Sequence, residues 1–206
     1  MKKKVFLVAV AVCLVAIISA GTLAWFSDSD SVKSTFYVAS SNEEADDIFS
    51  VGLQGKENAT YVDLLPGQVV ENLIEVENTG RYAQWVRVKI TFSDAKAWKE
   101  VLGDTALTSM LDVGAGWTAG GTLSDETNDT VTYVYYLNST LAKDEKAVAF
   151  QNVTIPTALT QKQAAAIGDF TVDVVAEAVQ FDNLGKTSAK EAFEAVGWTE
   201  EKAQIG

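Results

Sequence analysis

Residues 69–92, VVENLIEVENTGRYAQWVRVKITF, decide the fold class. Apolar and polar residues alternate with a period of two in both halves of this stretch, which is the pattern of half-buried β-strands. The turn-rich link NTGR at 78–81 predicts that the two strands form a hairpin. In that hairpin, the glutamates of the first strand would lie near Arg87 and Lys89 of the second, on a solvated outer face.

Similar strand patterns recur along the chain, at 58–64, 131–137, 146–155 and 169–181. Helical spacing occurs in three short places: 94–112 with a break at Gly103, the residues after Thr160, and the residues after Ser188. Gln163 and Glu191 complete capping-box patterns in the last two. Many short strands with few helices predict a mainly β protein, an antiparallel β-sandwich that is most simply a jelly roll.

The N-terminus has the features of a signal peptide. Three lysines at 2–4 precede an uncharged apolar run over 5–20. Thr22 and Ala24 supply the small side chains that a signal peptidase accepts, so cleavage after Ala24 would make Trp25 the mature N-terminus. The alternative is an uncleaved membrane anchor, because the apolar run read on through Phe26 reaches the length of about 20 residues that spans a bilayer.

Charge and composition exclude several classes of function. Removal of residues 1–24 takes away three of the 16 basic residues and none of the 28 acidic ones, so the net charge changes from −12 to −15. Such a chain repels nucleic acid, and the membrane is expected as a partner only through the uncleaved signal.

The side chains for catalysis and metal binding are also scarce. The chain has no histidine, and its one cysteine, Cys13, lies in the predicted signal peptide. This leaves no imidazole or thiolate for a nucleophile–base pair or for the usual zinc and copper ligand sets. No spacing singles out a pair of carboxylates, and no acidic cluster forms an ordered calcium loop. We therefore expect no catalytic residues, no cofactor and no metal site.

The segment between the signal and the first expected strand differs from the rest. In residues 25–47, serines and acids surround two apolar islands, Trp25-Phe26 and Phe36-Tyr37-Val38. The segment is too polar to form its own core, yet STFYVAS at 34–40 would make a strand at an open sheet edge. The alternative is a flexible leader.

The expected organisation has three parts: a signal peptide at 1–24, an N-terminal tail or donor-strand segment at 25–47, and a β-sandwich domain at 48–206 with a helical insertion at about 94–112.

Several of these stretches resemble a known family. The leader end GTLA with the following WFSDSDSVKSTFYVAS resembles the substrates of SipW-type signal peptidases, in which an aromatic residue, a Ser, Thr or Asn, and an Asp follow the cleaved bond. LLPGQVVENLIEVENTGRYAQWVRVKI resembles a hairpin of the TasA and camelysin family of Gram-positive surface and biofilm-matrix proteins. VDVVAEAVQFDNLG, with the following SAKEAFEAVGW, is similar to the closing strand and helix of that family.

The resemblance implies a secreted structural protein, a jelly-roll subunit of extracellular matrix or cell-surface fibres. Donor-strand complementation would join its copies head to tail. Residues 25–40 would be the donor, with Phe36 and Val38 as inward anchors and Trp25 and Phe26 gripping the neighbour. The implied partners are a SipW-type signal peptidase and further copies of the chain, and an accessory matrix protein stays open. The metalloprotease label of camelysin-like members does not carry over, because histidine is absent.

A competing interpretation is a monomeric cell-surface β-sandwich adhesin that binds a glycan or a protein. Its candidate exposed aromatic residues are Trp117, Tyr133, Tyr135 and Tyr136.

Overall fold

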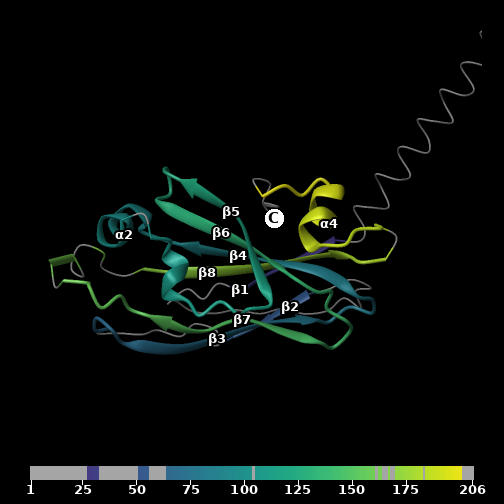
Figure 1. Ribbon diagram of the computed structural model, residues 1–206, viewed down its shortest axis with the longest axis horizontal. Coiled ribbons are helices and arrows are strands. Elements are labelled where there is room, and N and C mark those ends of the chain that lie inside the picture. Colours follow the sequence, from purple (N-terminus) through teal and green to yellow (C-terminus); the bar gives the residue numbers. More distant parts are fainter. Residues whose placement is uncertain are drawn as a thin grey trace, which may run out of the picture.

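The computed structural model describes residues 27–32 (backbone only), 51–55, 64–103, 105–160, 162–163, 167, 170–182 and 184–200. These residues form two antiparallel sheets that pack face to face, so the predicted β-sandwich is confirmed (Figure 1). One sheet has five strands, in the order β1 (Ser27–Val32), β8 (Val172–Gln180), β4 (Gln84–Phe92), β6 (Thr130–Leu137) and β5 (Trp117–Asp125). The other has three, in the order β2 (Val51–Gln54), β3 (Val69–Asn78) and β7 (Lys146–Thr154). The described helices are α2 (Ala95–Leu102), a 3-10 turn η1 (Leu107–Met110) and α4 (Ala189–Ala195).

The main core lies between the two sheets. Val76 of β3, Val88 and Ile90 of β4, and Phe150 of β7 are all fully buried in one cluster. These positions follow the alternation read from the sequence, because successive side chains of a strand point to opposite faces. Burying each such side chain stabilises the fold by about 1.5 to 3 kcal/mol, and the core thereby fixes which face of each strand points inward.

The predicted hairpin between β3 and β4 is wrong. Each strand has the predicted extent, but β3 pairs with β2 and β7 while β4 pairs with β6 and β8. The link at 79–83 therefore crosses from one sheet to the other. Asn78 is fully buried, and its side-chain amide donates to the carbonyl oxygens of Tyr82 and Leu141, both at 2.8 Å. Gln84 and Leu141 also exchange backbone hydrogen bonds, so a third segment fixes the crossover and separates the strands.

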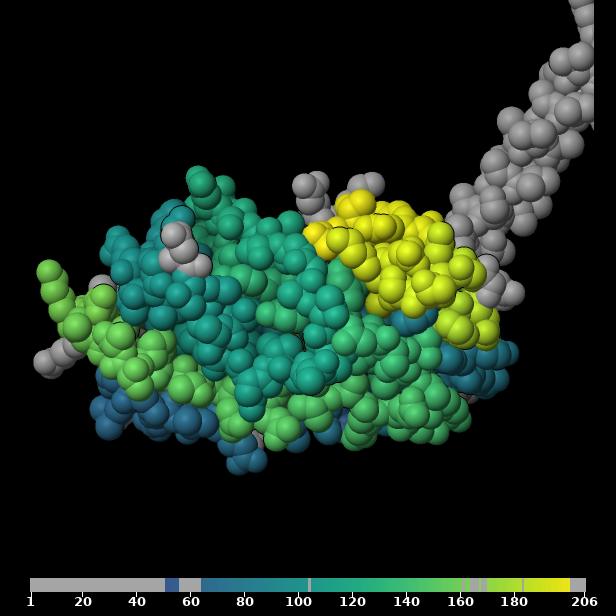
Figure 2. All heavy atoms as spheres, viewed as in Figure 1, coloured from purple at the N-terminus to yellow at the C-terminus, as the bar shows by residue number. Residues whose placement is uncertain are grey.

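The prediction of a solvated face around Arg87 and Lys89 is also wrong. Helix α4 and the residues after it lie on the outer face of the five-stranded sheet (Figure 1), and Figure 2 shows their yellow atoms gathered over one end of the molecule. Phe193 of α4 packs with Trp85 and Tyr136 in a second buried cluster. Strand β4 is consequently buried on both faces, and Arg87 is 0 % exposed.

Other elements agree with the sequence patterns. Strands β6, β7 and β8 match three of the expected strands, and the fourth, at 58–64, falls almost entirely outside the described residues. Gly103, with φ of +65°, ends α2 before η1, as predicted. Ser188 caps α4, because its side chain accepts from the backbone N–H of Glu191. Thr160 and Gln163 form the expected capping contacts.

Strands β2 and β5 were not predicted. In β5, Gly120 and Gly121 interrupt the alternation, and the pairing with β6 shifts register there.

Candidate assembly edge

Strand β1 forms one edge of the five-stranded sheet, and it is the edge strand nearest in sequence to the predicted cleavage site. It pairs antiparallel with β8, in a register that runs from Ser27 opposite Val179 to Val32 opposite Val174. The ordering of the sheet gives β1 a strand neighbour on one side only. Residues at the start of the predicted mature chain thus occupy a position that main-chain hydrogen bonds alone can hold.

The structure describes only part of the predicted donor segment. Strand β1 lies within the predicted donor segment 25–40. The named cleavage and polymerisation residues all lie outside the described residues: Thr22, Ala24, Trp25, Phe26, Phe36 and Val38. The stretch STFYVAS, expected to form the strand, also lies outside them. Sequence reasoning passed over SDSDSV because serine and aspartate have low β-propensity.

Strand β8 is a fully formed acceptor for β1. Its side chains are buried on both faces over most of its length, and β4 pairs with it from Gln84–Gln180 to Phe92–Val172. Val174, Ala176 and Ala178 point into the core between the sheets. If β1 were absent, the main-chain groups on the other side of β8 would lose their strand partner, which is costly for a strand so largely buried.

A buried ion cluster fixes the middle of β8. Glu177 lies opposite Ser29 of β1 and opposite Arg87 of β4. Its carboxylate accepts hydrogen bonds from Arg87 Nε and from Lys89 Nζ, the latter at 3.0 Å. All three side chains are at least 95 % buried. Burial lowers the pKa of Lys89, and the Glu177 carboxylate partly offsets this.

The C-terminal segment completes the cluster. The Arg87 guanidinium carbon lies 4.4 Å from the ring centroid of Phe193, and Nη1 donates to the carbonyl oxygen of Trp198 at 3.2 Å. Because Arg87 also binds Glu177, it ties α4 and the segment after it to β8, the strand with which β1 pairs. This arrangement encloses its three charged side chains almost completely.

The β7 edge of the other sheet is blocked by its own chain. Asp112 Oδ1 accepts from the backbone N–H groups of Gln151 and Asn152, both at 2.7 Å. Partial burial tends to raise the pKa of Asp112, but the hydrogen bonds from Asn152 and Gln151 together hold it below the ordinary 3.8. Trp117 Nε1 covers the neighbouring carbonyl oxygen of Val148 at 2.7 Å. Side chains thus protect this edge, whereas a strand covers the edge at β8.

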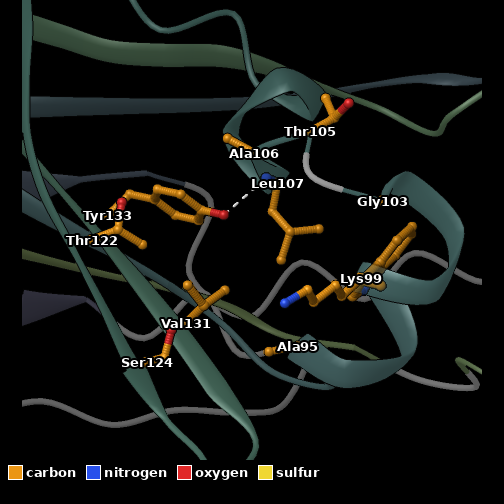
Figure 3. Close-up of a pocket in the computed structure, with 11 residues that line it drawn as sticks. Ala95, Lys99, Gly103, Thr105, Ala106, Leu107, Thr122, Ser124, Val131 and Tyr133 are labelled. Carbon is orange, nitrogen blue, oxygen red and sulfur yellow. Dashed lines mark hydrogen bonds between the residues drawn. The ribbon is translucent and has the colours of Figure 1, made fainter.

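A cavity of about 330 Å³ lies beside α2 and η1 (Figure 3). The amine of Lys99 points into it, and its lining includes the hydroxyl-bearing residues Thr105, Thr122 and Ser124. The Tyr133 hydroxyl accepts from the backbone N–H of Leu107 at 3.0 Å. The described lining contains no carboxylate.

The aromatic residues proposed for an adhesin belong to the protein interior. Trp117 and Tyr136 are buried, at 8 % and 5 % exposure. Tyr133 and Tyr135 are half-buried and pack against the main core. These four side chains therefore do not form an exposed platform for a sugar ring.

Within the part of the chain that the structure describes, no three acidic or cysteine side chains converge in a way that could hold a metal ion. None of the helices in those same ranges has the length and apolar character needed to cross a bilayer. No protein-family model matches the chain, and no curated protein has a significantly similar sequence.

Proposed function

We propose that the mature chain is a secreted structural protein that assembles head to tail into extracellular fibres by placing its β1 on the β8 of the next subunit. The observation that carries this proposal is the position of β1: a polar strand two residues after the predicted cleavage site, at the edge of a sheet whose other strands form the core. Adding a strand to an open sheet edge is a known mode of protein association.

Exchange of β1 between subunits would leave the number of main-chain hydrogen bonds nearly unchanged. The same residues would pair with the same partners, from Ser27–Val179 to Val32–Val174, whether they come from one subunit or from two. Domain swapping costs little for this reason, since each native contact is re-formed between copies.

The connection to β2 is long enough for this exchange. Residues 33–50 separate β1 from β2. A chain of that length spans at most about 60 Å when extended, which is comparable with the size of a small domain. Each donor strand leaves one subunit and enters another at a different surface, so the contact does not close and gives a filament.

Electron microscopy of the mature chain, residues 25–206, tests the proposal. Wild type is compared with Ser29→Pro and with the control Ser29→Ala. Ser29 lies in the middle of β1, opposite Glu177. Proline removes a main-chain donor and is poorly tolerated inside a paired strand, whereas alanine keeps the main chain intact.

We expect filaments from wild type and Ser29→Ala, and only single particles from Ser29→Pro. Thermal unfolding of each variant controls for loss of the whole fold. Filaments from Ser29→Pro at the wild-type protein concentration would overturn the proposal. Single particles from all three would favour the monomeric adhesin instead.

A further inference from the structure

The cavity beside α2 and η1 has no part in the proposed assembly. It is enclosed by α2 and η1 on one side and by β5 and β6 on the other (Figure 3). Strands β6 and β5 end the five-stranded sheet on the side away from β1, with β8 and β4 between them. The volume of about 330 Å³ is within the range of about 300–1,000 Å³ that is typical of small-molecule sites.

The cavity has an apolar interior and a polar rim. Trp98, Leu107 and Val131 line it and are buried. Lys99 and Ser124 line it as well, but both are exposed to solvent. A ligand that fits both parts needs an apolar body for the interior and a polar head group for the rim.

Several polar groups of the lining are hydrogen-bond donors that lack an acceptor. The Lys99 amine points into the cavity and forms no ion pair within the described ranges. Trp98 is 1 % exposed, and its indole N–H has no hydrogen-bond partner among the residues that the structure describes. On the β6 side, the Tyr133 hydroxyl oxygen accepts from the backbone N–H of Leu107 at 3.0 Å, so its own proton remains available to a ligand.

This set of donors favours an anionic head group. An ammonium group and an indole N–H only donate hydrogen bonds, and the described lining contains no carboxylate that would repel an anion. The chain as a whole carries a net charge of −12, so most of its surface repels anions and Lys99 provides a local exception. A small inorganic anion would leave the buried apolar residues without a contact, so an organic acid fits the cavity better.

We infer that this cavity binds a small organic acid, whose carboxylate pairs with the Lys99 amine and whose apolar body packs against Leu107 and Val131. Tyr133 offers a further donor from the sheet side of the cavity. The inference goes beyond fibre assembly and does not depend on it, because none of these residues belongs to β1 or β8.

Equilibrium dialysis of the mature chain, residues 25–206, measures the binding. The probes are phenylpropionate and octanoate, an aromatic and an aliphatic acid, and phenylpropanol is the neutral counterpart of the first. Lys99→Gln removes the cation. Lys96→Gln is the matched control, because Lys96 is exposed on the same helix but donates to the carbonyl oxygen of Glu126 at 3.1 Å and does not line the cavity. Thr122→Trp places a large side chain at an exposed lining position of β5.

We expect saturable binding of one phenylpropionate per chain. Lys99→Gln should weaken it about three- to tenfold, the effect of one charge-assisted hydrogen bond at a partly exposed site, and should leave the binding of phenylpropanol unchanged. Lys96→Gln should change neither, and Thr122→Trp should abolish both because it fills the cavity. Thermal unfolding of each variant controls for loss of the fold.

Two results would overturn the inference. One is the absence of saturable binding of both acids to the wild-type chain. The other is an equal loss of phenylpropionate binding in Lys99→Gln and Lys96→Gln, because the acid would then respond to the overall charge and not to the cavity. Neither result depends on whether the chain forms filaments, so the outcome is separate from that of the proposed function.

Discussion

Replacing the buried glutamate of β8 gives the most informative test of how this sheet is held together. Glu177 is 2 % exposed and accepts hydrogen bonds from both Arg87 and Lys89. At the 3.0 Å separation of Lys89 Nζ and Glu177 Oε1, two unit charges attract by about 5.5 kcal/mol at an effective dielectric constant of about 20. Desolvation offsets part of this attraction. Glu177→Gln should therefore cost about 3 to 5 kcal/mol of unfolding free energy, because it leaves two buried cations without their counter-ion.

Urea unfolding followed by circular dichroism measures this cost. Glu77→Gln is the matched control, because Glu77 forms a partly exposed pair with Lys146 at 3.4 Å. Such pairs contribute about 0 to 1 kcal/mol. A loss below about 1 kcal/mol for Glu177→Gln, equal to that of the control, would refute the view that the cluster couples β4, β8 and α4.

The same variant should change the pH dependence of stability. Burial lowers the pKa of Lys89 below the ordinary 10.5, while Glu177 opposes that shift. The folded chain then binds fewer protons than the unfolded chain between the lowered pKa and 10.5, so stability rises with pH across that interval. Glu177→Gln removes the opposing effect, and the rise should begin at lower pH than in wild type. Unfolding free energies that keep a constant difference between the two proteins from pH 7 to pH 10 would contradict this.

Two further predictions concern the edges of the sheets. Gly120→Ala should cost about 1 to 3 kcal/mol, because the new Cβ would lie 2.6 Å from the buried ring of Tyr136, whereas Gly121→Ala meets only the movable carboxylate of Glu200 and should cost less than about 0.5 kcal/mol. Urea unfolding of both variants checks the order, and equal losses would contradict it. Asp112→Ala should cost about 1 to 2 kcal/mol and increase association through the uncovered β7 edge. Because the folded pKa of Asp112 is lowered, its contribution is complete above the unfolded value of 3.8 and is lost as pH falls below it. Light scattering between pH 3 and pH 7 tests this, and scattering that is the same for wild type and variant throughout would contradict it.

Sequence periodicity predicted the positions of the strands that carry the core, but it did not predict which strands pair with each other. The alternation at 69–92 predicts β3 and β4 with nearly the observed ends, because one face of each strand lies in the core. A five-residue link does not show whether two strands share a sheet. The deciding contacts are those of Asn78 and Gln84 with Leu141, a residue about 60 positions away, which no local pattern includes.

The burial of Arg87 and Lys89 was missed for a similar reason. Charged residues at alternate positions are typical of a solvated face, and only the docking of α4 encloses them. The helix itself was predicted from its Ser188 cap, but not the surface it covers. The polarity and position of residues 25–40 led to the prediction of a donor segment, which stays a prediction. The strand SDSDSV within it pairs with β8 through its main chain, which side-chain propensity does not reveal.

Disulfide trapping of the β1–β8 pair tests the central claim most directly. Ser31 and Val175 are paired residues, and the Cα separation of about 4.5–5.5 Å in such pairs suits a disulfide. The predicted mature chain has no cysteine, so Ser31→Cys with Val175→Cys introduces its only two thiols. After assembly and then oxidation, strand exchange predicts a ladder of covalent oligomers on a non-reducing gel, lost on reduction. Filaments in which every disulfide closes within a single subunit would contradict the account.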